Sequence, residues 1–173
     1  MIAIRRINDE VFYAQDEIVC MGAAEIDFVK ARAAESPRGR ARICAHLDPT
    51  DGLHEMLIAL SRSGYVRPHR HVGREESFHA VDGEADVVIF DDAGGVEQVI
   101  RIGTGKDDTR IYRLNAPRFH TVLVRTACFV VYEVTQGPFD QHGTVFAPWA
   151  PPEGDLNGIA EFLAKVDSWL KER

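Results

Sequence analysis

The chain has 173 residues, 45% of them hydrophobic and 27% charged, which is typical of one globular domain with a substantial core. The formal net charge of −7 argues against general nucleic-acid binding, and no apolar run is long enough to predict a membrane span. Cys20, Cys44 and Cys128 are odd in number and far apart. We therefore expect three free, buried thiols and a cytoplasmic location.

Residues 1–50 are expected to form an extension that packs on the main domain. Within them, VFYA (11–14) could add an edge strand. The alanine-rich run 23–36 predicts a helix, because it ends just before Pro37, which disfavours helical geometry in the residue before it. RGRARICAHL (38–47) alternates arginine with small or apolar residues and predicts a strand.

Residues 51–154 contain a series of short extended segments separated by turns. The predicted strands are LHEMLIAL (53–60), YVRPHRH (65–71), SFHAVDG (77–83), EADVVIF (84–90), VEQVIRI (96–102), RIYRL (110–114), HTVLVRT (120–126) and CFVVYEVTQ (128–136). Strands at intervals of roughly ten residues favour a β-sandwich or small barrel. Pro68 places its strand at an edge or makes it irregular, because proline cannot donate to a ladder. Residues 137–154 are expected to be irregular.

The last segment, 155–173, predicts an amphipathic helix that packs on the barrel or on a partner chain. Its apolar residues recur at three- and four-residue steps: Leu156, Ile159, Phe162, Leu163, Val166, Trp169 and Leu170.

The most informative stretch is His69-x-His71-x4-Glu76. Residues two apart on a strand point to the same side, so His69 and His71 should project together. Glu76 begins the next extended run and could return a carboxylate to the same place. Two imidazoles and a carboxylate form a nitrogen and oxygen metal site, for which His120 is the best fourth ligand.

The remaining histidines are not predicted to be ligands. His79 has the opposite parity to Glu76 and should face away from the metal. His54 is expected on the surface, His46 in a structural or exposed position, and His142 on the surface of a loop.

Residues for substrate contact and proton transfer can be predicted from position. Arg67 belongs to a group of arginines around the two histidines, with Arg62, Arg70 and Arg74, and such a rim favours an anionic substrate. Arg67 is assigned to substrate binding, although solvated surface arginines remain an equal alternative. Tyr65 shares the parity of His69 and is a catalytic candidate. Glu133, a carboxylate within an apolar strand, is a second, with pairing to an arginine as its structural alternative.

These motifs resemble those of the cupins. Gly64, His69, His71, Glu76 and Gly83 follow the first cupin motif, G-x5-H-x-H-x3–4-E-x6-G, with one residue fewer before His69. In the second motif, Pro117-Arg-Phe-His120 keeps the proline and histidine but lacks the internal glycine, and Val124 replaces the asparagine. Over residues 23–154 the chain is most similar to the WbuC-type cupins.

The resemblance implies an all-β fold, a double-stranded β-helix (jelly-roll) barrel at 51–154. The N-terminal and C-terminal helices predicted from the local patterns would flank it, and the C-terminal helix lies outside the resemblance. The resemblance also implies one divalent metal ion (Zn, Fe, Mn or Ni) and a role linked to polysaccharide biosynthesis. The expected substrate is a small anionic, sugar-related molecule, and neither nucleic acid nor membrane is an expected partner. Three readings stay open: a metal-dependent isomerase, epimerase, hydrolase or dioxygenase; a binding or sensing module without turnover; and a barrel that the metal only stabilises. A homodimer is expected.

Overall fold

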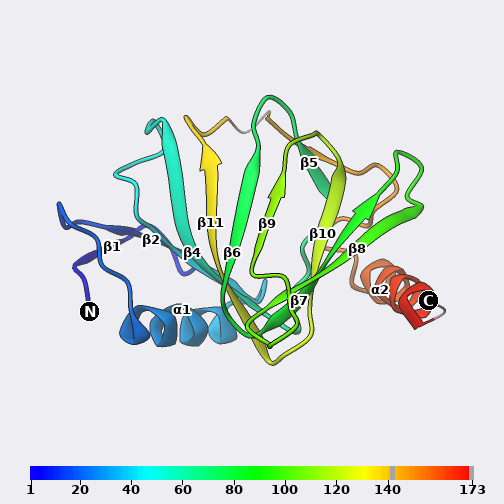
Figure 1. Ribbon diagram of the computed structural model, residues 1–173, viewed down its shortest axis with the longest axis horizontal. Helices are drawn as coiled ribbons and strands as arrows, with labels where there is room; N and C mark the ends of the chain where they lie inside the picture. The colour runs from blue at the N-terminus through cyan, green and yellow to red at the C-terminus, as the bar shows by residue number, and fades with distance from the viewer. Residues whose placement is uncertain (141–142, 172–173) are drawn as a thin grey trace.

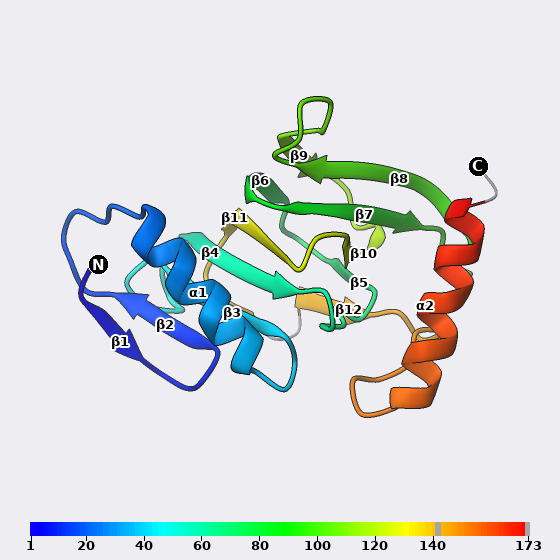
Figure 2. The same ribbon diagram turned by 90° about the horizontal axis from the view of Figure 1, so that it is seen from below.

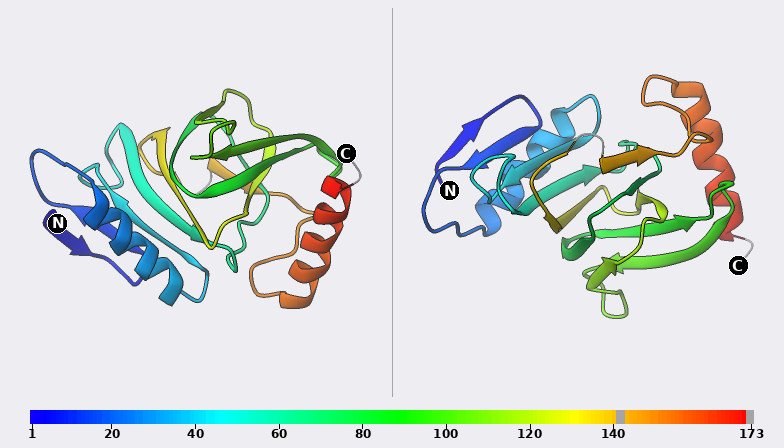
Figure 3. Two further views of the ribbon diagram at one scale, coloured as in Figure 1. Left: turned by 60° about the horizontal axis from the view of Figure 1, so that its bottom comes forward. Right: turned by 90° about the horizontal axis from the view of Figure 1, so that it is seen from above.

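The computed structural model describes residues 1–140 and 143–171, and its strands form two β-sheets packed face to face (Figure 1). One helix lies outside each sheet, so α1 and α2 occupy opposite sides of the molecule (Figures 2 and 3). The all-β barrel with two flanking helices is confirmed.

The first sheet has seven strands in the spatial order β1-β2-β3-β4-β11-β6-β9. Their bounds are Ile4–Arg6 (β1), Val11–Ala14 (β2), Arg40–Cys44 (β3), Leu53–Ser61 (β4), Cys128–Gln136 (β11), Glu76–Asp82 (β6) and Ile111–Leu114 (β9). Neighbouring strands are antiparallel, apart from the parallel pair β2 and β3.

The second sheet has five antiparallel strands in the order β12-β5-β10-β7-β8. Their bounds are Thr144–Phe146 (β12), His69–His71 (β5), Phe119–Val124 (β10), Glu84–Phe90 (β7) and Val96–Gly103 (β8).

The main core fills the space between the inner faces of the two sheets. Alternate residues of each strand point into it, as the two-residue period of a strand requires. Its buried members are Leu60, Phe78, Ala85, Val87, Ile89, Ile102, Tyr112, Val122, Phe129 and Val131. Phe129, Val131 and Glu133 share one parity on β11, so Glu133 continues this inward-facing row toward the end of the strand.

Helix α1 (Ala23–Glu35) covers the outer face of the seven-stranded sheet, where Val29 and Ala33 pack against Ile43 and Val130. Its first turn is held by Glu25, whose carboxylate accepts hydrogen bonds from the backbone of Gly22 at 2.8 Å and Ile2 at 2.9 Å. These bonds lower the pKa of Glu25 and tie Ile2, just before β1, to the helix.

Helix α2 (Leu156–Lys171) covers the outer face of the five-stranded sheet. Phe162, Val166 and Leu170 pack against a cluster that includes Val88 and Phe90. Of the two expected positions for this helix, packing on the barrel is therefore the one observed.

Three local predictions need correction. Residues 144–146 form strand β12, although they were expected to be irregular. VFYA is a strand but not an edge, because β1 lies outside it. The strand expected at 65–71 begins only at His69, and β5 lies between β12 and β10, so Pro68 marks an irregular approach to an interior strand.

The division at residues 50 and 154 stays a prediction. Strand β3, within the first fifty residues, pairs with β4 over five residue pairs. This part of the chain thus continues the sheet through its backbone as well as packing on it.

Candidate metal centre

Three histidines meet on the inner face of the five-stranded sheet. His69 and His71 lie on β5, and His120 lies directly opposite His69 on the neighbouring strand β10. One nitrogen of each ring lies within 4.8 Å of one nitrogen of each of the others. The alternation of a strand brings His69 and His71 together, and the strand pairing adds His120.

Glu76 reaches the same point from the opposite sheet, where it begins β6. Its carboxylate oxygens lie 3.0 Å from Nε2 of His120 and 3.3 Å from Nε2 of His71. The side chains of Glu76 and His120 are 2% and 1% exposed, so water does not solvate this pair. Ligand atoms bound about 2.0–2.2 Å from one ion lie about 3 Å from each other, which agrees with this spacing.

The second nitrogen of each ring has its own contact, which orients the ring. Nδ1 of His69 lies 2.9 Å from the carbonyl oxygen of Arg67, and Nδ1 of His120 lies 3.0 Å from that of Arg118. These acceptors favour the tautomer with the proton on Nδ1, which leaves Nε2 free as a ligand. Nδ1 of His71 lies 3.3 Å from Oγ1 of Thr144.

The four side chains fit a divalent metal, because two of their buried atoms lack a hydrogen-bond partner among the described residues. Oε1 of Glu76 and Nε2 of His120 are buried atoms without a hydrogen-bond partner among the described residues, although they lie 3.0 Å apart. Buried polar atoms are rarely left unsatisfied. A cation between these lone pairs would satisfy both, and imidazole with carboxylate suits Zn, Fe, Mn or Ni.

The electrostatics favour the metal-binding states of Glu76 and His69, but at His120 they favour the protonated ring. Burial would raise the pKa of Glu76, but His120 and His71 outweigh burial and hold it well below its usual value. Burial and the neighbouring His120 and His71 lower the pKa of His69 to about 3, so this ring is neutral. Burial lowers the pKa of His120, but Glu76 outweighs that effect and the pKa is raised. His120 is therefore the imidazole at which a proton competes with a metal.

Glu133 projects from β11 into the barrel, where it lies opposite Phe78 of β6. Its carboxyl group has no hydrogen bond or ion pair within residues 1–140 and 143–171. Burial, and next the charge of Glu76, raise the pKa of Glu133 to about 7, although Arg42 and Arg74 act in the opposite direction. A carboxyl group with this pKa can both hold and release a proton near neutral pH.

The other two predicted residues, Arg67 and Tyr65, lie in different surroundings. Arg67 lies at the rim, with its guanidinium 5.0 Å from the ring centre of Phe146. Phe146 is half exposed, and its ring centre is 6.3 Å from that of His69. Tyr65 instead donates a hydrogen bond to the carbonyl of Pro151 at 3.0 Å and packs edge-on against Phe162 of α2. The parity argument does not bring Tyr65 to the histidines, because the strand begins only at His69.

Several residues near the centre were not assigned to it from sequence. Arg74 donates to Oγ1 of Thr144 at 2.7 Å and lies 3.1 Å from Nδ1 of His71. Thr144 and Phe146 pair in register with His71 and His69, on the unpredicted strand β12. Tyr112 lies on β9, opposite Phe78. The sequence pointed to Arg74 as a member of the predicted cationic rim. The positions of Thr144, Phe146 and Tyr112 near the centre follow only from strand pairing.

The remaining histidines lie outside this centre. His79 is exposed, as its parity predicts. The prediction of a surface position for His54 is wrong: it is 4% exposed, and its ring stacks on that of buried His46 with the ring centres 4.1 Å apart. The prediction for His142 lies outside the described residues.

The fold is that of a cupin barrel. Protein SO0799 from Shewanella oneidensis has a similar structure, with a TM-score of 0.51, 11% identity, and coverage of 71% of this chain and 78% of that one. The capsular polysaccharide assembling protein CapF from Staphylococcus aureus matches with a TM-score of 0.50 and 16% identity, over 64% of this chain and 30% of that one.

Oxalate decarboxylase from Bacillus subtilis matches with a TM-score of 0.45 and 17% identity over 56% of this chain, which spans 24% of that enzyme. A family model described as "Domain of unknown function (DUF6016)" matches residues 21–102, less than half of the chain. No match to a curated protein reaches significance. None of the helices in the described part of the chain is long and apolar enough to cross a membrane.

Proposed function

We propose that this chain is a metal-dependent cupin that acts on a small anionic molecule at a centre formed by His69, His71, His120 and Glu76. The observation that carries the proposal is the convergence of these four side chains from two facing sheets, with unsatisfied ligand atoms on two of them. A structural zinc site would more often use cysteine ligands and close its coordination shell, whereas no thiol belongs to this group.

The proposed cofactor is one divalent ion, Zn, Fe, Mn or Ni. His69, His71, His120 and Glu76 would hold the ion, and an ion that takes more than four ligands could also bind a small molecule. A bound ion would polarise an oxygen atom of that molecule as a Lewis acid. The protein's part is to fix the three imidazoles through their outer nitrogens, which the contacts of His69 and His120 with backbone carbonyls support.

The anionic character of the substrate is supported by unpaired cationic groups at the rim. Neither Arg67 nor Arg74 has a carboxylate within ion-pair distance in the part of the chain that the structure describes. With a divalent ion nearby, these guanidinium groups leave an excess of positive charge that Glu76 alone does not balance. We assign Arg67 to the binding of a substrate oxyanion.

Proton transfer is assigned to Glu133, because its carboxyl group lacks a partner and its pKa is raised to about 7. Proton transfer to or from a substrate atom is the step that isomerases and epimerases share. The catalytic role predicted for Tyr65 stays a prediction, and its contacts with Pro151 and Phe162 support packing of α2 instead.

A sugar-related substrate and a place among the WbuC-type cupins also remain proposals. CapF is named as a capsular polysaccharide assembling protein, but at 16% identity it indicates the fold alone. A cytoplasmic location is supported by the free cysteines among the described residues, Cys20, Cys44 and Cys128. The prediction that all three are buried is wrong for Cys20, which is exposed. The homodimer stays a prediction.

The function can be tested with full-length protein carrying one equivalent of metal. A panel of sugar phosphates and small carboxylates is first screened by thermal shift, and each ligand found is then incubated with wild type and with Glu133→Gln. Product formed by wild type, together with unchanged ligand binding but little product in Glu133→Gln, supports the enzyme. Ligand binding without product in both proteins favours a sensing module, and no ligand at all contradicts the proposal.

A further inference from the structure

The barrel contains a buried hydroxyl group that the proposed function does not use, that of Tyr112. The residue is 7% exposed, and its hydroxyl oxygen has no hydrogen-bond partner among the described residues. Buried hydroxyl groups are nearly always satisfied in native proteins, by the chain, by water or by a ligand. The exception therefore needs a physical explanation.

Tyr112 lies next to the metal centre on the inner face of the seven-stranded sheet. It is opposite Phe78 on β6, and Glu76 is opposite Leu114, so Tyr112 and Glu76 are diagonal neighbours on adjacent strands. Such neighbours are about 7–8 Å apart, within reach of a long side chain. On the other side of Phe78, Glu133 occupies the matching position. Two proton-bearing groups thus lie on either side of the strand that supplies the carboxylate ligand.

The ring of Tyr112 is fixed by packing. It contacts Phe78 edge-on, with ring centres 5.8 Å apart, and belongs to the main core. Because the ring cannot turn away without opening that core, a partner for the hydroxyl must come from outside the chain. Burial and the charge of Glu76 raise the pKa of Tyr112, so the hydroxyl keeps its proton and can act as a donor at neutral pH.

We propose that Tyr112 donates a hydrogen bond to an oxyanion of the molecule bound at the metal centre. This inference rests on the proposed function and deepens it. The ligand would present one oxygen to the ion and a second to the phenol, an arrangement that carboxylate and phosphate groups share. Arg67 at the rim would contact an anionic group nearer to solvent, so Tyr112 and Arg67 would bind different parts of one molecule.

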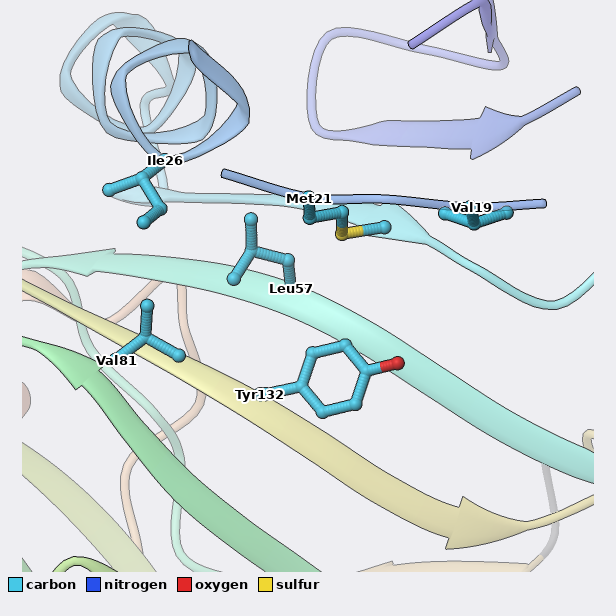
Figure 4. Close-up of a pocket in the computed structure, with 6 residues that line it drawn as sticks. All are labelled: Val19, Met21, Ile26, Leu57, Val81 and Tyr132. Atoms are coloured by element: carbon cyan, nitrogen blue, oxygen red, sulfur yellow. The ribbon is translucent and has the colours of Figure 1, made fainter. Parts of the chain in front are cut away.

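A matched control is provided by Tyr132, which lies on the outer face of the same sheet. Its ring borders a cavity of about 270 Å³ between β4, β11 and α1 (Figure 4). The other lining residues are Val19, Met21, Ile26, Leu57 and Val81. Tyr132→Phe removes a phenol from the same sheet, but on the face that points away from the metal centre.

The test uses full-length wild type, Tyr112→Phe and Tyr132→Phe, first without metal and then with one equivalent of Co²⁺. In the metal-free proteins, Tyr112→Phe should unfold at the same denaturant concentration as wild type or a higher one, because the lost hydroxyl has no partner in the chain. In the Co²⁺ proteins, binding of malonate and of inorganic phosphate is followed through the visible absorption of the ion. Tyr112→Phe should weaken binding of at least one anion by about ten- to a hundredfold, as expected for a hydrogen bond to a charged group.

The two anions separate the possible ligand chemistries. An effect confined to malonate assigns the hydroxyl to a carboxylate, and one confined to phosphate assigns it to a phosphate ester. Tyr132→Phe should leave both affinities unchanged.

The inference is overturned if Tyr112→Phe binds both anions as wild type does, which would leave the hydroxyl to a buried water. It is also overturned if the wild-type Co²⁺ protein binds neither anion, or if metal-free Tyr112→Phe is clearly less stable than wild type. Failure of wild type to retain Co²⁺ refutes the metal centre itself and is thereby distinguished from failure of the role of Tyr112.

Discussion

Replacement of Glu133 by glutamine should stabilise the metal-free protein at pH 8 and leave its stability nearly unchanged at pH 4. In the native state, burial and Glu76 raise the pKa of Glu133 from 4.5 to about 7. Between pH 4.5 and about pH 7, Glu133 therefore keeps its proton in the native protein but has already lost it in the unfolded chain. Wild-type stability falls as the pH rises through this window, whereas glutamine, which does not ionise, avoids the loss.

The size of the effect follows from the pKa shift. Each unit corresponds to about 1.4 kcal/mol, so the shift of Glu133 corresponds to roughly 3 kcal/mol as an upper limit above pH 7. Below the unfolded pKa, both states are protonated and the difference should shrink to a few tenths of a kcal/mol. Rearrangement of water or of the nearby Arg74 would reduce the value at pH 8 without changing its sign.

The assay is urea unfolding of chelator-treated protein at pH 4, 6 and 8, with Glu161→Gln on the exposed face of α2 as the control. The stability difference between Glu133→Gln and wild type should grow across this series, and Glu161→Gln should show little change. A difference that does not depend on pH, or a less stable Glu133→Gln at pH 8, would refute the description of Glu133 as a partly buried and unpaired carboxyl group.

Three further predictions concern the ligands and the turn that closes the motif. His71→Ala should fold but no longer retain metal, as measured by elemental analysis. The control His79→Ala, on the exposed side of β6, should retain metal. Full metal content in His71→Ala would contradict the ligand assignment. Because the pKa of His120 is raised above 6.5, metal affinity measured by competition with a chelator should still increase with pH above that value, and a flat profile would count against it. Gly83→Ala should lower the free energy of unfolding by at least about 1–2 kcal/mol, because residue 83 has a φ of +77° and a Cβ there would lie 2.3 Å from the carbonyl oxygen of Cys128. The control is Gly154→Ala, because no atom lies within 4 Å of a Cβ at that position. An equally small effect of both substitutions would contradict the prediction.

The local patterns predicted most of the fold. Alternation located eight strands of the barrel region, and the alanine-rich run before Pro37 gave α1 within one residue of its observed end at Glu35. These signals are local and therefore readable in a single sequence. Strand β12 was missed because its three residues lie between glycine and proline and gain their pairing only from β5.

The site was predictable where it follows from strand parity and not where it depends on pairing between strands. His69 and His71 are two residues apart on one strand, so their convergence can be inferred directly. Tyr65 has the same parity, but the chain is not in the sheet before His69, and alternation fails there. Tyr112 has no neighbour in sequence that indicates a role, because its position depends on the register of β9 with β6.

His54 shows the same limit for burial. Its spacing gives no ligand partner, which favoured a surface position. It lies instead on β4 opposite Thr135, and the ring of His46 covers it through a stack with an angle of 3° between the planes. Sequence separation alone does not reveal such a pair, because the loop between β3 and β4 brings the two rings together.

X-ray absorption spectroscopy of full-length protein carrying one equivalent of Zn²⁺ would test the metal centre most directly. The ion should show nitrogen and oxygen neighbours at about 2.0–2.2 Å, with the outer-shell scattering of three imidazole rings. Sulfur at about 2.3 Å, or scattering from fewer than two imidazoles, would contradict a centre built from His69, His71, His120 and Glu76.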